Sequence, residues 1–204
     1  MRPYSKTYTP TPADDNGLAT TVGGTSGVAF VQIATTVGTD GLAHLILITP
    51  DGSITGNFTI TGTDADGDAQ TEVLTTNTTN AVTSAKYYAT VTSVLAPAGI
   101  GSANVIIGWT DVNVSPIYPL DWASTAQAAI TISVTGTINF TVQETLANVL
   151  SGVAAAWSSI AALANKTAIT SSVSVAGATA FRVLINSLTS TPTYTIYTSQ
   201  PVRR

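Results

Sequence analysis

The residues best suited to chemistry lie in one acidic stretch, TGTDADGDAQTE, at positions 61–72. Asp64, Asp66 and Asp68 alternate around Gly67, as oxygen ligands do in calcium-binding loops. The stretch departs from the EF-hand pattern, because Gly67 precedes the third aspartate and no glutamate closes a twelve-residue loop. Strand-like runs flank it, and Asp-Gly between strands is a strong hairpin signal. We therefore expect a hairpin turn, and we keep a calcium site at these three aspartates as the alternative.

His44 is the only histidine, so a Ser-His-Asp triad would have to use it. No serine stands in a G-x-S-x-G nucleophile elbow, and the chain has no cysteine to join His44 around zinc. We expect His44 to be a strand residue with a satisfied hydrogen bond. Asp121 with Glu144, or Asp111 with Glu72, would supply the acid pair of a glycosidase, but any chain with eleven acids offers such pairs. The sequence predicts no catalytic residue, no cofactor and no enzymatic activity.

Aromatic side chains offer a different chemistry, because their rings can stack on sugars. The candidates are Trp109, Trp122, Trp157, Tyr87, Tyr88, Tyr118, Tyr194 and Tyr197. Most of them stand at the ends of strand-like runs or near residues 113–119, where packing in a core or an interface is the commoner role. A carbohydrate-binding module that adheres to host surfaces is therefore an alternative function, with Trp122 as the residue to test.

The amino-acid composition indicates which kind of fold must position these residues. Of 204 residues, 44% are hydrophobic and only 9% are charged, whereas charged residues make up about 25% of typical globular domains. Threonine is abundant, and with valine and isoleucine it favours β-strands. A surface of hydroxyl groups suits a protein that is packed against neighbours. The net charge of −4 argues against nucleic acid as a partner.

Short strand-like runs separated by turn residues fill the chain from Gly23 onward, which predicts an all-β fold of sandwiches or barrels. The runs form two series of similar order: residues 59–63 parallel residues 133–137, and residues 88–95 parallel residues 181–188. By this parallel, TGTINFTVQET in the second series is a shorter hairpin link without aspartate. We expect two tandem antiparallel β-sandwich domains, jelly-roll or immunoglobulin-like, at 23–113 and 114–204.

Two further segments complete the expected plan. Residues 1–22 contain three prolines and no apolar signal core, so we expect an extended N-terminal arm rather than a secretion signal. Apolar residues between 146 and 166 recur at helical spacing and predict one short helix or helical turn in the second domain. Asn, Ser and Gly interrupt that segment, so we expect no membrane span.

Four stretches of the second half resemble small proteins encoded among the virion genes of tailed bacteriophages. They are Pro-Leu-Asp at 119–121, VTGTINFTVQET at 134–145, Trp157, and AFRV at 180–183. In the first half, FTITGTDADGDAQTEVL similarly resembles a β module repeated in phage structural proteins.

The resemblance implies a structural virion protein, located in virions that are assembled in the host cytoplasm. The leading expectation is a capsid decoration, or cement, protein that binds the major capsid protein or another virion protein as a symmetric homo-oligomer, with a trimer favoured. The alternative is a neck or tail adaptor or a fibre-attachment protein. The resemblance implies no catalytic residues.

Overall fold

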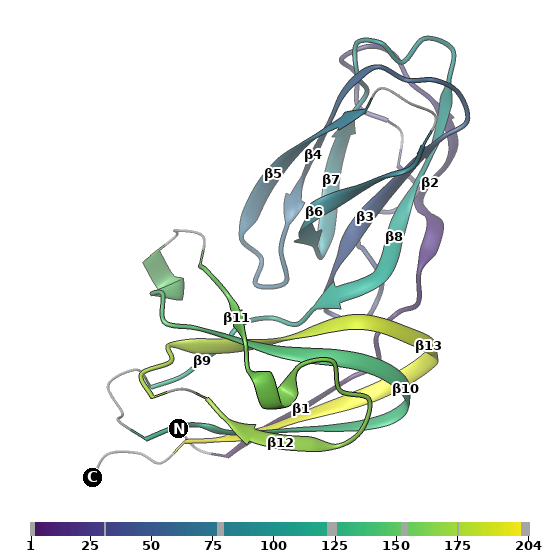
Figure 1. Ribbon diagram of the computed structural model, residues 1–204. Helices are drawn as coiled ribbons and strands as arrows, with labels where there is room; N and C mark the ends of the chain where they lie inside the picture. Colours follow the sequence, from purple (N-terminus) through teal and green to yellow (C-terminus); the bar gives the residue numbers. More distant parts are fainter. Residues whose placement is uncertain are drawn as a thin grey trace. The chain divides into compact units, whose positions relative to one another are not determined.

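The computed structural model describes residues 3–30, 32–76, 80–121, 126–151, 155–174 and 176–200 (Figure 1). The protein is 61% strand and 3% helical, and its sheets are antiparallel, so the predicted all-β class is confirmed. The chain divides into two compact units. Unit 1 comprises residues 1–10 and 114–204, and unit 2 comprises residues 11–113.

Unit 2 contains two antiparallel sheets around one core. Its strands are β2 (Asp14–Gly23), β3 (Ala43–Pro50), β4 (Gly56–Thr63), β5 (Ala69–Thr76), β6 (Val82–Tyr88), β7 (Thr90–Leu95) and β8 (Asn104–Val114). One sheet has the order β2-β8-β3-β6 and the other the order β5-β4-β7. Side chains alternate along each strand, so Ile46 and Ile48 of one sheet and Phe58 and Ile60 of the other join a single buried cluster. Full burial of each such side chain stabilises the fold by about 1.5–3 kcal/mol.

Unit 1 is built on two long neighbouring strands, β10 (Ala129–Thr145) and β13 (Ala180–Ser199), which pair along their whole lengths (Figure 1). Short strands extend them: β1 (Tyr4–Tyr8) and β9 (Tyr118–Pro119) pair with β13, while β11 (Ser158–Ser159) and β12 (Thr170–Val173) pair with β10. Two 3₁₀ turns, η1 (Val149–Ser151) and η2 (Ala161–Leu163), lie in the connection from β10 to β12. Alternate residues of β10 and β13 are buried and form the core of this unit.

Within β10, Gly136 marks a bulge rather than a hairpin. Its φ of +87° is a conformation that glycine adopts without strain, and the register with β13 shifts between Thr135 and Thr137. The sequence-based hairpin link in TGTINFTVQET is therefore wrong, because this stretch lies inside one continuous strand. The stretch has no Asp-Gly or Asn-Gly pair to reverse the chain, so the bulge twists the strand and the strand continues.

The N-terminal residues are built into the sheets instead of forming a separate arm over residues 1–22. β1 pairs with β13 from Tyr4 opposite Thr198 to Tyr8 opposite Tyr194, and β2 pairs with β8. The prolines at 3, 10 and 12 lie outside both strands, so they interrupt the regular structure without preventing it. The arm is thus divided between the two units at residues 10 and 11.

In the described part of residues 146–166, short helical turns form instead of a continuous helix, so of the two expectations only the helical turn is confirmed. There the chain forms η1, then β11, then η2. Asn148 favours a turn, because its Oδ1 accepts a hydrogen bond from the backbone N–H of Leu150 at 3.0 Å. Ser158 and Ser159 instead pair with Glu144 and Gln143 of β10. None of the described helices has the length and apolar character needed to cross a membrane.

Candidate functional site

The acidic stretch forms the predicted hairpin turn between β4 and β5, which confirms that expectation. Asp64 organises the turn: its Oδ1 accepts hydrogen bonds from the N–H groups of Asp66 at 2.9 Å and Asp68 at 3.0 Å. Gly67 provides the left-handed residue of the turn, with a φ of +87°. In the described part of the chain, no three His, Cys, Asp or Glu side chains are grouped to hold a metal ion. The turn geometry accounts for the carboxylate of Asp64, and Asp66 and Asp68 contribute their backbone N–H groups.

The proposed acid pairs serve the backbone instead. Both carboxylate oxygens of Glu72 accept N–H groups of β6, from Ala85 at 2.7 Å and Lys86 at 3.0 Å. This carboxylate therefore links the edges of the two sheets of unit 2. Asp111 Oδ1 accepts the N–H of Ala13 at 2.7 Å. Glu72 and Asp111 are thus occupied with different backbone segments.

The other acid pair lies in unit 1. Glu144 is buried in β10, opposite Phe181 of β13. The backbone N–H of Asp121 donates to the side chain of Gln200 at 2.8 Å.

His44 is a fully buried residue of β3, as the sequence predicts. Its Nδ1 lies 3.1 Å from the carbonyl oxygen of Thr110, and its Nε2 lies 3.0 Å from Asp40 Oδ2. Asp40 also accepts the N–H groups of Thr11 and Leu42. Burial acts to raise the pKa of Asp40, but the hydrogen bond and charge of His44, with these N–H groups, outweigh burial and hold the pKa below its usual value. The pair is structural, because both side chains are fully buried and their hydrogen bonds join them to the backbone of unit 2.

Most of the candidate aromatic residues belong to the cores. Tyr88 is fully buried, and burial, with the nearby charge of Glu72, raises the pKa of its hydroxyl. Trp109 is buried, and its Nε1 donates to the carbonyl oxygen of Pro12 at 3.0 Å. Trp157 is half-buried beneath the guanidinium of Arg182, which lies 4.4 Å from its ring centre. Trp122 lies outside the described residues.

An aromatic cluster joins β1, β9 and β13 in unit 1. Tyr8 stacks on Tyr194 with ring centres 5.3 Å apart, and Tyr118 stacks on Phe181 at 5.0 Å. The hydroxyls of Tyr8 and Tyr118 are 2.7 Å apart, and burial together with this hydrogen bond raises the pKa of Tyr118. The cluster therefore fixes β1 against the body of unit 1. It confirms a packing role for Tyr118 and Tyr194.

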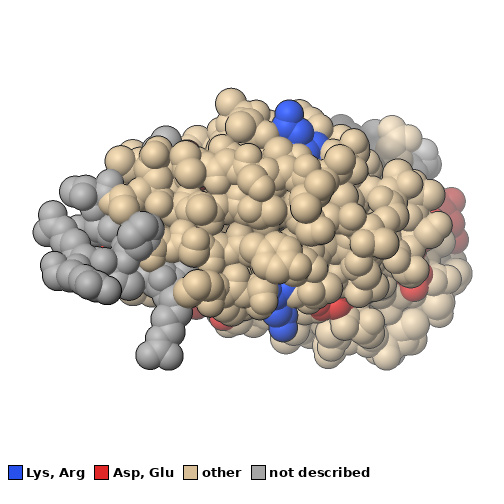
Figure 2. Space-filling view, turned by 90° about the horizontal axis from the view of Figure 1, so that it is seen from below, with Lys and Arg blue, Asp and Glu red and all other residues tan. Residues whose placement is uncertain are grey.

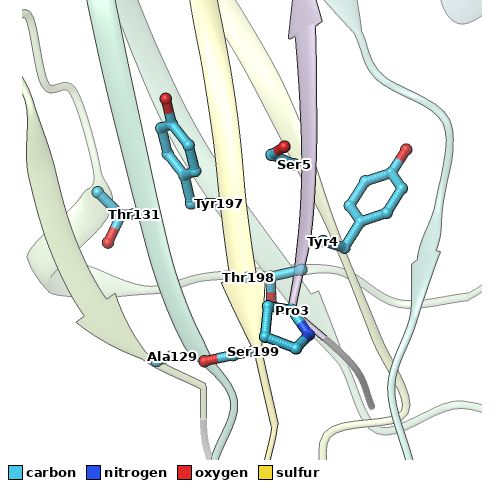
Figure 3. Close-up of a pocket in the computed structure, with 8 residues that line it drawn as sticks. All are labelled: Pro3, Tyr4, Ser5, Ala129, Thr131, Tyr197, Thr198 and Ser199. Atoms are coloured by element: carbon cyan, nitrogen blue, oxygen red, sulfur yellow. The ribbon is translucent and has the colours of Figure 1, made fainter.

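Tyr197 and Tyr4 differ from the other aromatic residues, because 48% and 43% of their surfaces are exposed. Figure 3 shows Tyr197 between β10 and β13, while Tyr4 points away from it on the far side of β1. A hollow of about 300 Å³ lies here, lined by Pro3, Tyr4, Ser5, Ala129, Thr131, Tyr197, Thr198 and Ser199. A second hollow of about 570 Å³ is lined by Pro3, Tyr4, Lys6, Tyr8, Pro116, Ile117, Tyr118 and Pro119. Unit 1 thus carries an open surface with accessible rings and hydroxyls.

Unit 1 also exposes two leucines in the loop that follows β10. Leu146 and Leu150 are 67% and 87% exposed. The loop is nevertheless ordered by its polar residues: Asn148 accepts the N–H of Leu150, and Ser151 Oγ donates to the Asn148 carbonyl at 2.7 Å. The sequence pattern assigns both leucines to the buried face of a helix, so it misses them as a surface. The turn-forming Asn148 between them was the signal that pointed to a loop.

No protein-family model matches the chain, and no curated protein matches it either. Its function is therefore inferred from two surfaces of unit 1. These are the leucine loop, residues 146–151, and the exposed sheet face around Tyr197.

Proposed function

We propose that the chain is a structural protein of a tailed-bacteriophage virion, most directly a capsid decoration protein that binds the head as a symmetric homo-oligomer. The stretches that resemble phage virion proteins support this proposal, since residues 134–145 form most of β10 and residues 180–183 begin β13. These two stretches are neighbours, with Thr145 opposite Ala180 and Val142 opposite Val183. The resemblance thus lies in the paired framework of unit 1.

The observation that carries a partner-binding role is the leucine loop. Leu150 leaves 87% of its surface in water, in a turn that hydrogen bonds hold in place. Full burial of one leucine in a partner gains about 1.5–3 kcal/mol, and an ordered loop loses little conformational entropy on binding. Such a loop is suited to enter an apolar groove of the major capsid protein.

The scarcity of charge supports repeated packing against neighbours. Figure 2 shows a face on which Lys and Arg or Asp and Glu atoms are few and separated. The whole chain has 7 basic and 11 acidic residues, so few ions have to be desolvated when its surface is covered. In a symmetric oligomer, modest contacts of each copy add through effective concentration.

The proposal includes two tandem β-sandwich domains. In unit 2, the packing of the β2-β8-β3-β6 sheet and the β5-β4-β7 sheet around one buried cluster supports it. A fold of this kind, stiffened by long antiparallel pairing, presents loops in fixed positions for docking. A place in the neck or tail is the alternative, and it would need only one ring of copies.

Cosedimentation with phage heads that lack this protein tests the leucine loop. Leu150→Ser is expected to weaken head binding by about tenfold or more, because most of a leucine's burial energy is lost. Val73→Ser, at a 55% exposed position of unit 2, is the matched control and should bind like the wild type. Equal binding of wild type and Leu150→Ser, with both variants folded, would remove the loop from the docking surface.

A further inference from the structure

We propose that the exposed face of the β12-β10-β13-β1 sheet of unit 1 binds an uncharged glycan, with the ring of Tyr197 as its stacking platform. This inference concerns a small-ligand site and does not depend on the virion proposal. It rests on the register of four strands, the exposure of one ring, and the chemistry of the side chains around that ring.

The register places Tyr197 in the middle of a row of hydroxyls. Tyr197 of β13 lies opposite Ser5 of β1 on one side and Thr131 of β10 on the other. Thr131 in turn lies opposite Ser171 of β12, and their hydroxyl oxygens are 2.8 Å apart. Directly opposed residues share a face of the sheet, and adjacent strands are about 4.8 Å apart. The row therefore presents an aromatic ring with a hydroxyl side chain on the neighbouring strand to each side.

One neighbouring row repeats the hydroxyl chemistry, and the other is partly apolar. Residues two positions away along each strand are on the same face. They are Thr7, Thr195 and Ser133 on one side, and Ser199, Ala129 and Val173 on the other. The hydroxyl oxygens of Thr7 and Thr195 are 2.8 Å apart. None of these side chains carries a charge at neutral pH, so this face is neutral, with hydroxyls around Tyr197 and the apolar Ala129 and Val173 at one end.

The hollow beside Tyr197 gives the face a recess (Figure 3). Its volume of about 300 Å³ is at the lower end of small-molecule sites. Ser5, Thr131 and Ser199 line it together with Tyr197, and all four belong to the exposed face.

The chemistry of the face selects among ligand classes. An acidic polysaccharide or a nucleic acid would require Lys or Arg, and none lines this hollow among the described residues. A protein partner would require an apolar centre within about 800 Å² of surface, whereas the ring of Tyr197 lies between Ser5 and Thr131, and the apolar Ala129 and Val173 lie at one end of the face. A neutral sugar has both an apolar C–H side for the ring and hydroxyls for Ser and Thr. An uncharged glycan is therefore the ligand that the face fits.

NMR titration of the full chain with cellohexaose, maltohexaose and chitohexaose tests the site. At least one of these oligosaccharides is expected to shift the amide signals of Ser5, Thr131 and Tyr197. Tyr197→Ala should weaken that binding by about tenfold or more, in line with aromatic stacking energies. Tyr197→Phe, which keeps the ring, should retain most of it.

Two further variants keep the test decisive. Thr131→Val preserves the β-branched shape of a strand residue and removes only a hydroxyl, so it should weaken binding by a few-fold at about the scale of one hydrogen bond. Leu150→Ala, in the leucine loop, should bind glycans like the wild type. If no neutral oligosaccharide shifts these amides, or if Tyr197→Ala binds unchanged, the site is refuted. Preferential binding of polygalacturonate would also overturn it, because the ligand would then be acidic.

The two proposals can fail separately. Loss of head binding in Leu150→Ser with glycan binding intact would support docking through the leucine loop alone. Loss of glycan binding in Tyr197→Ala with head binding intact would support the sugar site alone.

Discussion

At the scale of single residues, the buried pair of Asp40 and His44 is the group whose loss should affect stability. Asp40 accepts hydrogen bonds from His44, Thr11 and Leu42, and so ties the loop after Gly38 to the segment that precedes β2. The sequence predicts a satisfied His44, because a lone histidine in an apolar strand has no chemical partners to suggest a site. It does not predict Asp40, because the partner lies in a loop whose course depends on the whole of unit 2.

Asp40→Asn should destabilise the protein strongly. The amide replaces one accepting oxygen with a donor, which leaves a buried donor of His44, Thr11 or Leu42 without its acceptor. The expected loss is about 3 kcal/mol in the free energy of unfolding, measured by urea denaturation. Asp51→Asn is the control, because Asp51 is exposed and bonds only the neighbouring Asn104, and its effect should be much smaller. Equal losses in the free energy of unfolding for the two substitutions would mean that the buried pair stabilises the protein no more than the exposed Asp51 does.

The same carboxylate predicts a pH dependence. The pKa of Asp40 in the folded state lies below its ordinary value of 3.8, so the folded state binds its proton more weakly than the unfolded chain does. This group therefore contributes stability above the ordinary value, and the contribution is lost as the pH falls through the lower folded pKa. Thermal melts between about pH 2 and pH 6 should show a smaller acid-induced decrease in Asp40→Asn than in the wild type. Parallel curves for the two proteins would contradict this assignment.

The sequence identifies some of the exposed residues of unit 1 and misses others. Tyr197 belongs to the aromatic candidates of the sequence, but exposure distinguishes it from Tyr194, which is buried three positions earlier. The two differ because an odd number of steps along a strand reverses the face. The sequence pattern assigns Leu146 and Leu150 to a buried helix face because their spacing fits a helix. The turn at Asn148 breaks that spacing and leaves both side chains exposed.

At the scale of elements, the local patterns predict strands and one turn well. The runs at 56–63 and 69–76 coincide with β4 and β5, because alternation and an Asp-Gly turn are both local signals. The strand-like run at 27–37 forms no named strand in its described residues, 27–30 and 32–37, where isolated bridges join Ala29 to Leu95 and Thr36 to Thr90. Its apolar residues serve different environments, since Phe30 is buried and Ile33 is 64% exposed. Contacts with the distant strand β7 decide its course, and a local pattern does not contain them.

Gly62 allows β4 and β7 to approach closely. A Cβ atom at this position would lie 1.9 Å from the carbonyl oxygen of Thr90, and the register between the strands shifts there. Gly62→Ala should therefore force the strands apart and cost about 3 kcal/mol in the free energy of unfolding. Gly67→Asn, in the β4–β5 turn, has open space and a conformation that Asn tolerates, so it should cost less than about 1 kcal/mol. Urea denaturation of both variants compares them, and a harmless Gly62→Ala would contradict the close approach.

At the scale of the whole molecule, the chain begins in unit 1, forms unit 2, and then returns to complete unit 1. β1 is the strand that makes this arrangement, and the bond between the hydroxyls of Thr7 and Thr195 joins residues 188 positions apart. The sequence predicts two β units but not this exchange, because a short run between prolines looks like an arm until its partner strand is known. The tyrosines of the aromatic cluster select β13 as the partner of β1, which the local sequence pattern of β1 does not do.

Tyr8→Ala should therefore destabilise unit 1 through β1. The substitution removes the ring that stacks on Tyr194 and the hydroxyl that pairs with Tyr118, at an expected cost of about 3 kcal/mol. Hydrogen exchange should become faster in residues 194–198 of β13, which β1 covers, while β3 of unit 2 keeps its protection. Thr7→Ala, at the exposed neighbouring position, is the control and should leave exchange nearly unchanged. Equal protection of β13 in Tyr8→Ala would show that β1 is held by other contacts.

Quantitative mass spectrometry of virions purified from the source of this chain tests the proposed decoration role most directly. A decoration protein should be present in on the order of hundreds of copies per particle, because it follows the symmetry of the head lattice. A count of about six to twelve copies would contradict decoration and favour a ring in the neck or tail. Absence of the chain from purified virions would contradict the structural role altogether.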